Sequence, residues 1–318
     1  MKKSVWICLL PIIFTLLLTS CGLFNMFGTA GDTTAPSMAG TPGLVYEELA
    51  DGTYVITGYT GTAGEVVIPS THEGKEVKSI GSRAFEGCTG LTSVAIPSSV
   101  TSISSSAFDG CIGLIQTEDD VSYVDRWVVG CNYTATNVSL RDNTVGIADS
   151  AFYGCTGLTS IEIPSSVTSI DEYAFLCCTR LTSITIPSSV TSIDEYAFSG
   201  CTGLTSIEIP SSVTSIGDSA FRGCTGLTSI AIPSSVTSIG DSAFEGCTGL
   251  TSIEIPSSVT SIGSRAFYGC ERLESVTFGD TSGWRTSETA IPEEALADAG
   301  KAAECLTSIY RYYDWKRG

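Results

Sequence analysis

Histidine is nearly absent from this sequence, since His72 is the single histidine among 318 residues. A Ser-His-Asp triad would have to use it, and the surrounding stretch Ser-Thr-His-Glu-Gly has none of the features of a nucleophile elbow. We interpret His72 as a solvated loop residue. The sequence also has no Cys-x-x-Cys pair and no histidine close to a cysteine, so it gives no basis for a zinc site.

Basic residues are also scarce, with 16 Lys and Arg against 34 Asp and Glu and a formal net charge of -18. A surface this acidic repels the phosphates of nucleic acids and of anionic lipids, which argues against electrostatic binding to either. The carboxylate pairs Asp171-Glu172 and Asp194-Glu195 recur at one repeat position, where capping of a turn explains them better than acid–base catalysis. No glycine loop has the lysine and spacing of a phosphate-binding loop. We therefore expect a protein that is not an enzyme and that has no cofactor.

Residues 1–20 are typical of a bacterial lipoprotein signal peptide. Two lysines precede an apolar run over residues 5–18, which is shorter than the roughly 20 residues of a bilayer span. The run ends in Leu-Thr-Ser-Cys, which resembles a lipobox, so cleavage would leave Cys21 as the lipid-carrying first residue. The alternative is an uncleaved anchor helix with an incidental Cys21. We expect this lipid to anchor the protein at the bacterial cell surface, in the outer membrane. The anchor would be stable because two or more acyl chains hold a protein firmly on a bilayer.

Two short segments separate this signal from the repeats. Residues 21–43 are rich in Gly, Thr, Ala and Pro and show no hydrophobic period, which is typical of a flexible tether. Residues 44–80 contain alternating runs such as Tyr54-Val55-Ile56-Thr57 between glycine-containing turns. These runs predict strands and hairpins that form an N-terminal β cap.

Residues 81–279 repeat themselves with a constant period. Ala-Phe pairs mark each unit, and most of them follow one another at an interval of 23 residues, as Phe244 and Phe267 do. The wider gap between Phe108 and Phe152 contains one degenerate unit, in which Trp-Val-Val-Gly-Cys at 127–131 stands in place of Ala-Phe-x-Gly-Cys. One unit cannot bury its own apolar row, so the units must stack. Counting the degenerate unit, we predict about nine rungs.

The apolar positions of one unit indicate the path of the chain. The step of two from Ile207 to Ile209 is the period of a strand, and Pro210 ends that strand. Later steps of three and four, with Asp or Ser before the Ala-Phe pair, predict turns and a short helical or 3-10 segment. The predicted class is therefore α/β, with a parallel sheet on one face of a solenoid and short turns on the other.

The pattern Leu-x-x-Ile-x-Ile-Pro-x-x-Val-x-x-Ile-x-x-x-Ala-Phe-x-x-Cys resembles one known family. It is similar to the BspA-like leucine-rich repeat proteins, bacterial surface antigens with 23-residue repeats, over about residues 80–278. This resemblance implies a right-handed leucine-rich repeat horseshoe with its parallel sheet on the concave face. It also implies surface display and attachment to host matrix proteins or to other microbes. Residues 115–148 depart from the pattern, and the family supplies no binding residues to carry over.

One repeat position is a cysteine in almost every unit. We expect free, buried thiols there, because cysteine packs as a small hydrophobe, and scattered disulfides are the alternative. Cys177, which breaks the Gly-Cys pattern, is expected to face outward. The cysteines at the repeat position are Cys88, Cys111, Cys155, Cys178, Cys201, Cys224, Cys247 and Cys270.

The outward strand positions form two polar rows on the predicted concave face. Glutamates alternate with neutral residues in the first row, which avoids like charges on adjacent strands. We predict that this face binds a protein with a basic or hydroxyl-rich surface, and the alternative is that both rows are solvated fillers. The first row contains Ala95, Ser139, Glu162, Thr185, Glu208, Ala231 and Glu254, and the second contains Ser93, Ser160, Ser183, Ser206, Ser229 and Ser252.

Other places on the chain offer weaker candidates. The degenerate region 115–148, with Arg126 and Trp127, could hold a specialised site, and Tyr173 and Tyr196 could face outward or pack between rungs. Residues 280–318 predict a C-terminal cap, with a helix from Pro292. An aromatic ligand platform is the alternative for its four last aromatic residues, Tyr310, Tyr312, Tyr313 and Trp315.

Two functions remain open at this point. The first is an adhesin-like surface protein whose partner is a host matrix protein or a surface protein of another microbe. The second is a passive structural or coat protein with weak carbohydrate binding, which the near-identity of the units favours because a specialised site usually appears as a local deviation.

Overall fold

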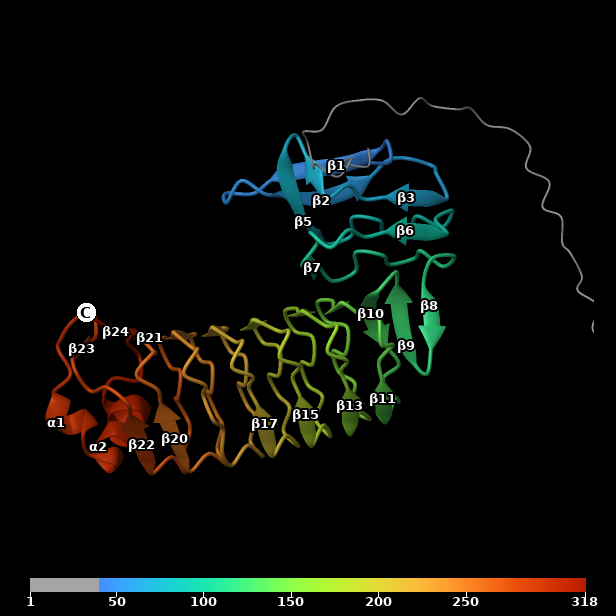
Figure 1. Ribbon diagram of the computed structural model, residues 1–318. Coiled ribbons are helices and arrows are strands. Elements are labelled where there is room, and N and C mark those ends of the chain that lie inside the picture. Colours follow the sequence, from blue (N-terminus) through green and yellow to red (C-terminus); the bar gives the residue numbers. More distant parts are fainter. Residues whose placement is uncertain (1–39) are drawn as a thin grey trace, which may run out of the picture. The chain divides into compact units, whose positions relative to one another are not determined.

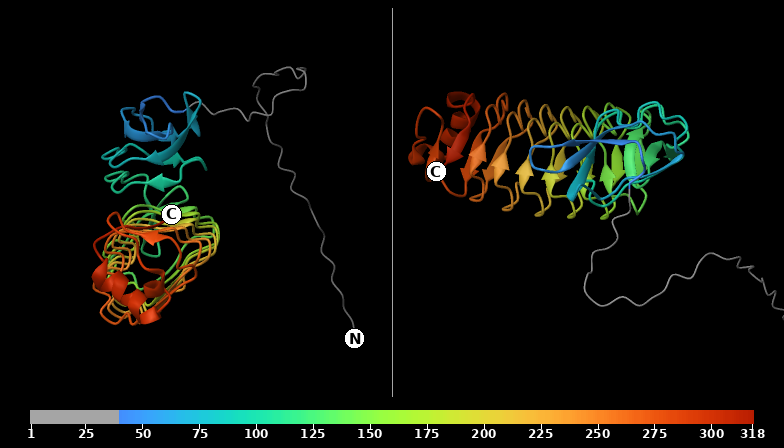
Figure 2. Two further views of the ribbon diagram at one scale, coloured as in Figure 1. Left: turned by 90° about the vertical axis from the view of Figure 1, so that its left-hand side faces the viewer. Right: turned by 90° about the horizontal axis from the view of Figure 1, so that it is seen from above.

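The repeats form a β-solenoid in the computed structural model, which describes residues 40–318 (Figure 1). The array has about 10 turns, close to the nine that we predicted. The turns that follow the β8–β10 meander lie over one another in the left view of Figure 2, whereas the turns before it form a separate short stack. The predicted signal peptide, Cys21 and most of the predicted tether lie outside the described residues. Among the described residues, no helix has the length and apolar character needed to span a membrane.

The first ladder of strands contains the Ile-x-Ile motif, as predicted. Its strands are short because a proline follows the motif and cannot donate to a continuing ladder. The register aligns equivalent residues of successive turns, for example Ile184 with Ile207. The parallel pairs are β3 (Glu65–Val67) with β6 (Ser93–Ala95), β11 (Asn137–Ser139) with β13 (Ser160–Glu162), β15 (Ser183–Thr185) with β17 (Ser206–Glu208), and β20 (Ser252–Ile255) with β22 (Ser275–Phe278).

A second ladder, which we did not predict, runs through the Ser-Ile pair of each Val-Thr-Ser-Ile stretch. Strands of two residues leave no alternation that sequence periodicity can detect. Strand pairing divides this ladder into three pieces: β5 (Lys75–Ile80) with β7 (Ser102–Ile103), β12 (Gly146–Ile147) with β14 (Ser169–Ile170), and β16 (Ser192–Ile193) followed by β18 (Ser215–Ile216), β19 (Ser238–Ile239) and β21 (Ser261–Ile262).

The third side of each turn carries the Ala-Phe pair. The N–H groups of Ser219 and Phe221 donate to Asp241 and Ala243 of the next turn, at 2.7 and 2.8 Å. The intervening Ala220 N–H donates instead to Gly217, three residues back. The helical segments expected here are thus single turns, and residues 40–292 contain no helix. The capping by aspartate is also different from our prediction. Asp218 Oδ1 accepts the N–H of Asp241 in the next turn, rather than an N–H of the turn to which Asp218 itself belongs.

Columns of like side chains fill the interior. The rings of Phe198 and Phe221 are fully buried and stack with centroids 5.6 Å apart, slightly more than the strand spacing of about 4.8 Å. The repeat-position cysteines beside them are free, and those from Cys111 onward are buried, as predicted, whereas Cys88 is only half-buried. The Sγ–H of Cys201 donates to the Phe175 carbonyl at 3.1 Å, and the same contact recurs in most turns. Burial raises the pKa of the Cys224 thiol to about 12, so it stays protonated.

An antiparallel meander interrupts the array at the degenerate unit. It contains β8 (Gln116–Glu118), β9 (Val121–Val124) and β10 (Trp127–Cys131). Trp127 pairs with Gly146 and Val128 with Ile147, so residues 127–131 join the second ladder. Our alignment of this stretch with Ala-Phe-x-Gly-Cys was therefore wrong, because an inserted hairpin has shifted the repeat phase. The alignment of residues 138–140 with Ile-x-Ile is confirmed by the pairing of Val138 with Ile161.

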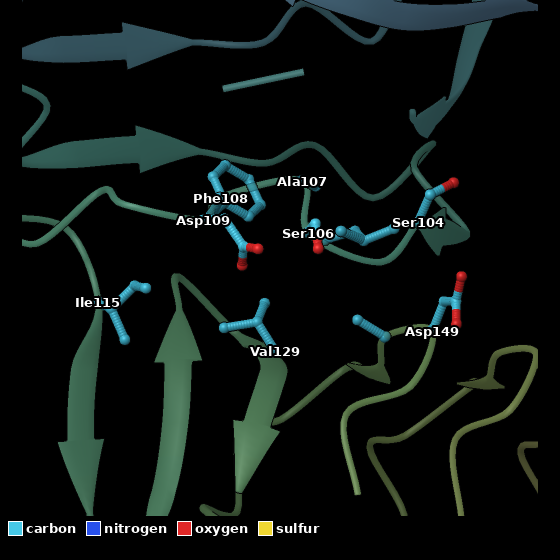
Figure 3. A pocket seen from close by; sticks show the side chains of 10 residues that line it. Ser104, Ser106, Ala107, Phe108, Asp109, Ile115, Val129 and Asp149 are labelled. Carbon is cyan, nitrogen blue, oxygen red and sulfur yellow. The ribbon is translucent and has the colours of Figure 1, made fainter. Parts of the chain in front are cut away.

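Around this interruption, aspartate side chains accept backbone N–H groups in place of the carbonyls of a neighbouring turn. Ile96 N–H donates to Asp125, Ser105 N–H to Asp149 and Ile103 N–H to Asp171, at 3.0, 3.1 and 2.8 Å. A small cavity of about 40 Å³ lies at the same place, between the turn that contains Phe108 and the one that contains Asp149 (Figure 3). Two hydrophobic clusters meet here, one over residues 54–148 and the other over residues 121–315.

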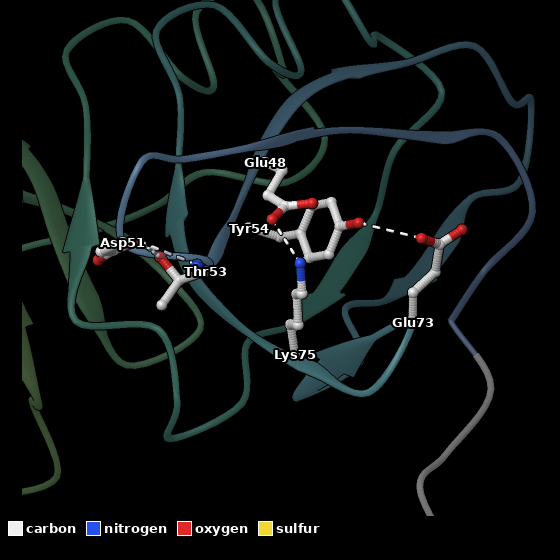
Figure 4. Close-up of polar contacts among 6 residues, drawn as sticks. All are labelled: Glu48, Asp51, Thr53, Tyr54, Glu73 and Lys75. Carbon is white, nitrogen blue, oxygen red and sulfur yellow. Dashed lines mark hydrogen bonds and ion pairs between the residues drawn. The ribbon is translucent and has the colours of Figure 1, made fainter.

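The N-terminal cap is smaller than residues 44–80, because β3 and β5 already belong to the two ladders. β1 (Leu44–Glu48), β2 (Tyr54–Tyr59) and β4 (Thr71–His72) cover the first turn. An ion pair between Glu48 of β1 and Lys75 of β5, and a 3.1 Å hydrogen bond from Tyr54 of β2 to Glu73, hold the cap on the first turn (Figure 4). His72 stacks on the Tyr46 ring at 3.8 Å, which differs from the solvated loop position that we expected.

The C-terminal cap contains α1 (Glu293–Leu296), α2 (Ala299–Glu304), a π-helical turn η1 (Cys305–Ile309), β23 (Trp284–Arg285) and β24 (Trp315–Arg317). The single helix that we predicted from Pro292 is thus broken, and Asp298 caps α2. β24 pairs antiparallel with β21 and ends the second ladder. Trp315 is buried against Phe278 and Trp284, as expected of a cap, whereas Tyr312 is half exposed.

Candidate interaction surface

The two predicted rows are exposed along the first ladder. All residues of both rows point away from the core, which the flanking isoleucines face. The register places Glu162 opposite Ser139, and Glu208 between Thr185 and Ala231, so no glutamate lies opposite another. This arrangement follows from the period of two in each strand.

The rows do not form one continuous surface. Ala95 and Ser93 belong to the β3–β6 pair, and the β8–β10 meander separates that pair from β11. Ala95 therefore lies outside the segment that contains the glutamates. The inserted hairpin stands in the chain where the strand that pairs with β6 would otherwise follow. The remaining rows are also divided into short paired pieces, as no strand pairing joins β13 to β15. We name the part from β11 to β22 the strand face.

Hydroxyl groups elsewhere on the turns are occupied by the fold. Thr205 Oγ1 donates to the Thr182 carbonyl at 3.3 Å, Thr237 Oγ1 to Thr214 at 3.2 Å and Ser235 Oγ to Val213 at 2.6 Å. Equivalent bonds recur from turn to turn and join each rung to the one before it. The richness of this sequence in Ser and Thr thus has a structural cause that we did not recognise from the sequence.

The rows of the strand face differ from these hydroxyls. Within residues 40–318, no intramolecular hydrogen bond involves the side chains of Ser183, Ser206, Glu208 or Glu254. Ser139 and Ser160 are exceptions, because Ser139 Oγ bonds Glu162 at 3.2 Å and Ser160 Oγ bonds an asparagine that replaces serine in the row. Most of the strand face therefore presents polar groups that water or a partner must satisfy.

The residues that we singled out in the degenerate region are not freely exposed, although Tyr133 in the same region is 65% exposed. Trp127 and Tyr123 are buried, and Arg126 is half-buried. Arg141 lies 4.1 Å over the Tyr123 ring and bonds Glu118 at 2.7 Å. These aromatic residues close the core beneath the meander, so their deviation from the repeat has a packing reason.

On the turn side, Tyr173 and Tyr196 pack against each other from rung to rung, which is the second of the two positions that we considered for them. Tyr173 and Tyr196 stack with centroids 5.0 Å apart, and both have a positive φ, of 55° and 54°. Asp171, which precedes Tyr173 by two residues, is 3% exposed. Burial is the main cause that raises the pKa of Asp171 to about 8, while bonds from Ser169 and Ile103 oppose the rise. The acceptor role of Asp171 depends on a contact with residue 103 that no local pattern reveals.

No histidine, cysteine or carboxylate cluster among residues 40–318 has the arrangement of a metal site. The His72 ring packs between Tyr46 and Tyr54, with centroids 3.8 and 4.9 Å away. The chemistry of the exposed surface is thus that of hydroxyls and carboxylates in regular rows.

The chain belongs to the BspA type leucine-rich repeat family. The family model matches residues 64–175, 129–250 and 168–295, in six copies. This is a family of bacterial surface proteins with leucine-rich repeats. No curated protein is similar enough to match the chain.

Several solved structures are similar to it. A leucine-rich repeat protein of T. pallidum is 29% identical over 73% of this chain and 90% of its own, with a TM-score of 0.39. One from Bacteroides ovatus is 29% identical over 76% of this chain and 71% of its own, with a TM-score of 0.42. A leucine-rich cell surface protein of Faecalibacterium prausnitzii is 26% identical over 77% of this chain and 89% of its own, with a TM-score of 0.31.

Proposed function

We propose that this protein is a lipid-anchored bacterial surface protein that binds another protein through its strand face. One observation carries the proposal. The hydroxyls of the turns are bonded to neighbouring rungs, whereas those of Ser183 and Ser206, like the carboxylates of Glu208 and Glu254, make no bond within residues 40–318. A surface with regularly spaced, unoccupied polar groups on a rigid scaffold suits recognition of a basic or hydroxyl-rich partner.

The experiment compares the full-length protein with a variant in which Glu162, Glu208 and Glu254 are replaced by Ser. Binding to immobilised host matrix proteins and to microbial cells should weaken with the variant, while the melting temperature stays unchanged because these side chains are exposed. Replacing Glu271, Glu274 and Glu304 by Ser removes the same charge elsewhere and serves as the matched control. Equal binding by both variants would show that the glutamates of the strand face do not recognise the partner.

The lipid anchor is tested separately. Cys21→Ala should move the protein from the membrane fraction to the soluble fraction and abolish labelling by a fatty acid. The alternative function, a passive coat, is supported if the anchored protein covers the cell but no matrix protein or cell binds the strand face above background.

A further inference from the structure

The acidity of this protein is not evenly distributed along the described chain. Residues 40–264 contain 7 Lys and Arg against 24 Asp and Glu, a net charge of -17 (7 - 24). Residues 265–318 contain 7 against 9, a net charge of -2 (7 - 9). This last segment, which contains the end of the repeats and the C-terminal cap, therefore holds a large share of the cations, and five of them lie in residues 280–318.

Two of these cations lie side by side on the last strands. Arg285 of β23 and Lys316 of β24 are directly opposite partners in an antiparallel pair. Their neighbours Trp284 and Trp315 are buried, so alternation along the strands turns Arg285 and Lys316 to the outer face, where both are exposed. Like charges directly opposite each other destabilise a sheet. The fold thus carries a cost at this pair.

No carboxylate within residues 40–318 forms an ion pair with either cation. Arg317, the next residue, forms an ion pair with Asp280 at 3.1 Å and is neutralised. Asp314 lies near the pair, but its Oδ1 accepts the Ser264 N–H at 3.1 Å. The positive charge of Arg285 and Lys316 is therefore available to a ligand.

A cavity of about 450 Å³ lies beside the pair. Its walls are formed by Arg285, Lys316, Arg317, Asp314, Thr286, Ser287 and Gly318. This volume is within the range of small-molecule sites, about 300–1,000 Å³, and is larger than a single oxyanion needs. Arginine and lysine together suit carboxylate, phosphate or sulfate groups, with arginine able to bind two of their oxygens at once.

We propose that this cavity, which we name the cap pocket, binds a sugar-sized organic anion, with its acidic group held between Arg285 and Lys316. The exposed hydroxyl of Ser287 is placed to bond the neutral part of the ligand. Asp314, which is also part of the wall, repels a second negative charge, so ligands with one acidic group should bind better than polyanions. This site is independent of the strand face and of the function proposed for it.

The test measures ligand affinity by calorimetry and by the rise in melting temperature of the full-length protein. Glucuronate, glucose 6-phosphate and glucose 6-sulfate are the probes, glucose is the neutral control and inorganic phosphate is the free oxyanion. At least one acidic sugar should bind and raise the melting temperature, glucose should not, and binding should weaken as salt is added. Absence of binding by all three acidic sugars overturns the proposal.

The variant Arg285→Gln/Lys316→Gln should weaken binding about tenfold or more, because it removes two charge-assisted contacts. Arg180→Gln/Arg272→Gln removes two exposed arginines that form no ion pair within residues 40–318, and it should leave affinity unchanged. Without ligand, the Arg285→Gln/Lys316→Gln protein should melt at the wild-type temperature or slightly above it, since the repulsion is gone. Undiminished affinity of this variant overturns the proposed site, and inorganic phosphate that binds as tightly as the acidic sugars overturns the assignment to a sugar.

Discussion

Turns that contain Asp-Glu-Tyr and turns that contain Gly-Asp-Ser use the same three positions on the third side of the solenoid. The first kind occurs at 171–173 and 194–196, and the second at 217–219 and 240–242. The backbone is the same in both, with a positive φ at the third position, 55° at Tyr173 and 55° at Ser219. The difference is therefore in how the side chains satisfy that backbone.

In the Gly-Asp-Ser turns, the aspartate caps the next turn. Asp218 Oδ1 accepts the Asp241 N–H at 2.7 Å, and Asp241 Oδ1 accepts the Ser264 N–H at 2.8 Å. A Cβ on Gly240 would collide with the Asp218 carboxylate, so this cap requires a glycine in the following turn. An aspartate in one turn and a glycine in the next turn are therefore needed together for this hydrogen bond to form.

In the Asp-Glu-Tyr turns, an aspartate occupies the glycine position, and it is buried at Asp171 and half-buried at Asp194. Asp171 bonds Ser169 and the Ile103 N–H, and the tyrosine that follows stacks on its equivalent in the next turn. Such a stack is worth about 0.5–1.5 kcal/mol, which offsets the strain of a bulky residue at positive φ. The comparison teaches that one backbone can be satisfied in two ways, because Asp218 depends on the glycine of the following turn whereas Asp171 depends on Ser169 and on the Ile103 N–H.

The largest effect should come from the core that both kinds of turn share. Phe175 lies in an Asp-Glu-Tyr turn and Phe221 in a Gly-Asp-Ser turn, and both are fully buried. Replacing either by Ala should lower the free energy of unfolding by about 3–5 kcal/mol. The two losses should agree within about 1 kcal/mol if the turns differ only at the surface. Denaturant unfolding measures both, and a clearly smaller loss for Phe221→Ala would show that the two kinds of turn pack differently.

The next effect distinguishes the two kinds of turn by pH. Burial raises the pKa of Asp171 to about 8 from its ordinary value of 3.8, so the folded protein binds a proton that the unfolded chain releases in this interval. The stability that this proton supplies is complete below about pH 4 and is lost as pH rises through about 8. The melting temperature should therefore fall between pH 5 and pH 8. Asp171→Asn, which keeps an acceptor for Ile103 and cannot ionise, should flatten that fall.

Asp171→Ala complements this variant. It leaves the buried Ile103 N–H without an acceptor and should cost about 1–3 kcal/mol at pH 5, more than Asp171→Asn costs. A wild-type slope that persists in Asp171→Asn would assign the pH dependence to other carboxyls whose pKa burial also raises, such as Asp194.

The sequence predicts the periodic part of this structure well. The constant interval between Ala-Phe pairs and the step from Ile207 to Ile209 are enough to place the first ladder, the Phe column and the buried cysteines, because stacking in register follows from repetition. The outward rows follow from the same alternation. What periodicity misses is the second ladder, whose strands, such as Ser215–Ile216, are too short to show a period of two.

Contacts between distant residues explain the remaining errors. The meander at residues 116–131 shifts the repeat phase, and nothing in its local composition shows that Trp127 pairs with Gly146. The carboxylate of Asp171 likewise reaches residue 103, in a turn that precedes the meander. Ala95 is separated from the strand face for the same reason. The cap pocket arises from the pairing of β23 with β24, between which the whole helical part of the cap lies in sequence.

The smallest effect concerns the one cysteine that departs from the glycine pattern. Cys177 has φ 61° where Gly200, Gly223 and Gly246 have φ near 70°, and its side chain, which we expected to face outward, is half-buried. Cys177→Gly removes the strain of an L-residue in the left-handed region but adds chain entropy to the unfolded state, so the free energy of unfolding should rise by only about 0.5 kcal/mol. When the folded proteins are titrated with a thiol reagent, Cys177→Gly should show one accessible thiol fewer than the wild type. Cys178→Ala should show the same number as the wild type because Cys178 is buried. A fall in melting temperature for Cys177→Gly would mean that the Cys177 side chain, which lies over Gly200, contributes more by packing than the backbone strain costs.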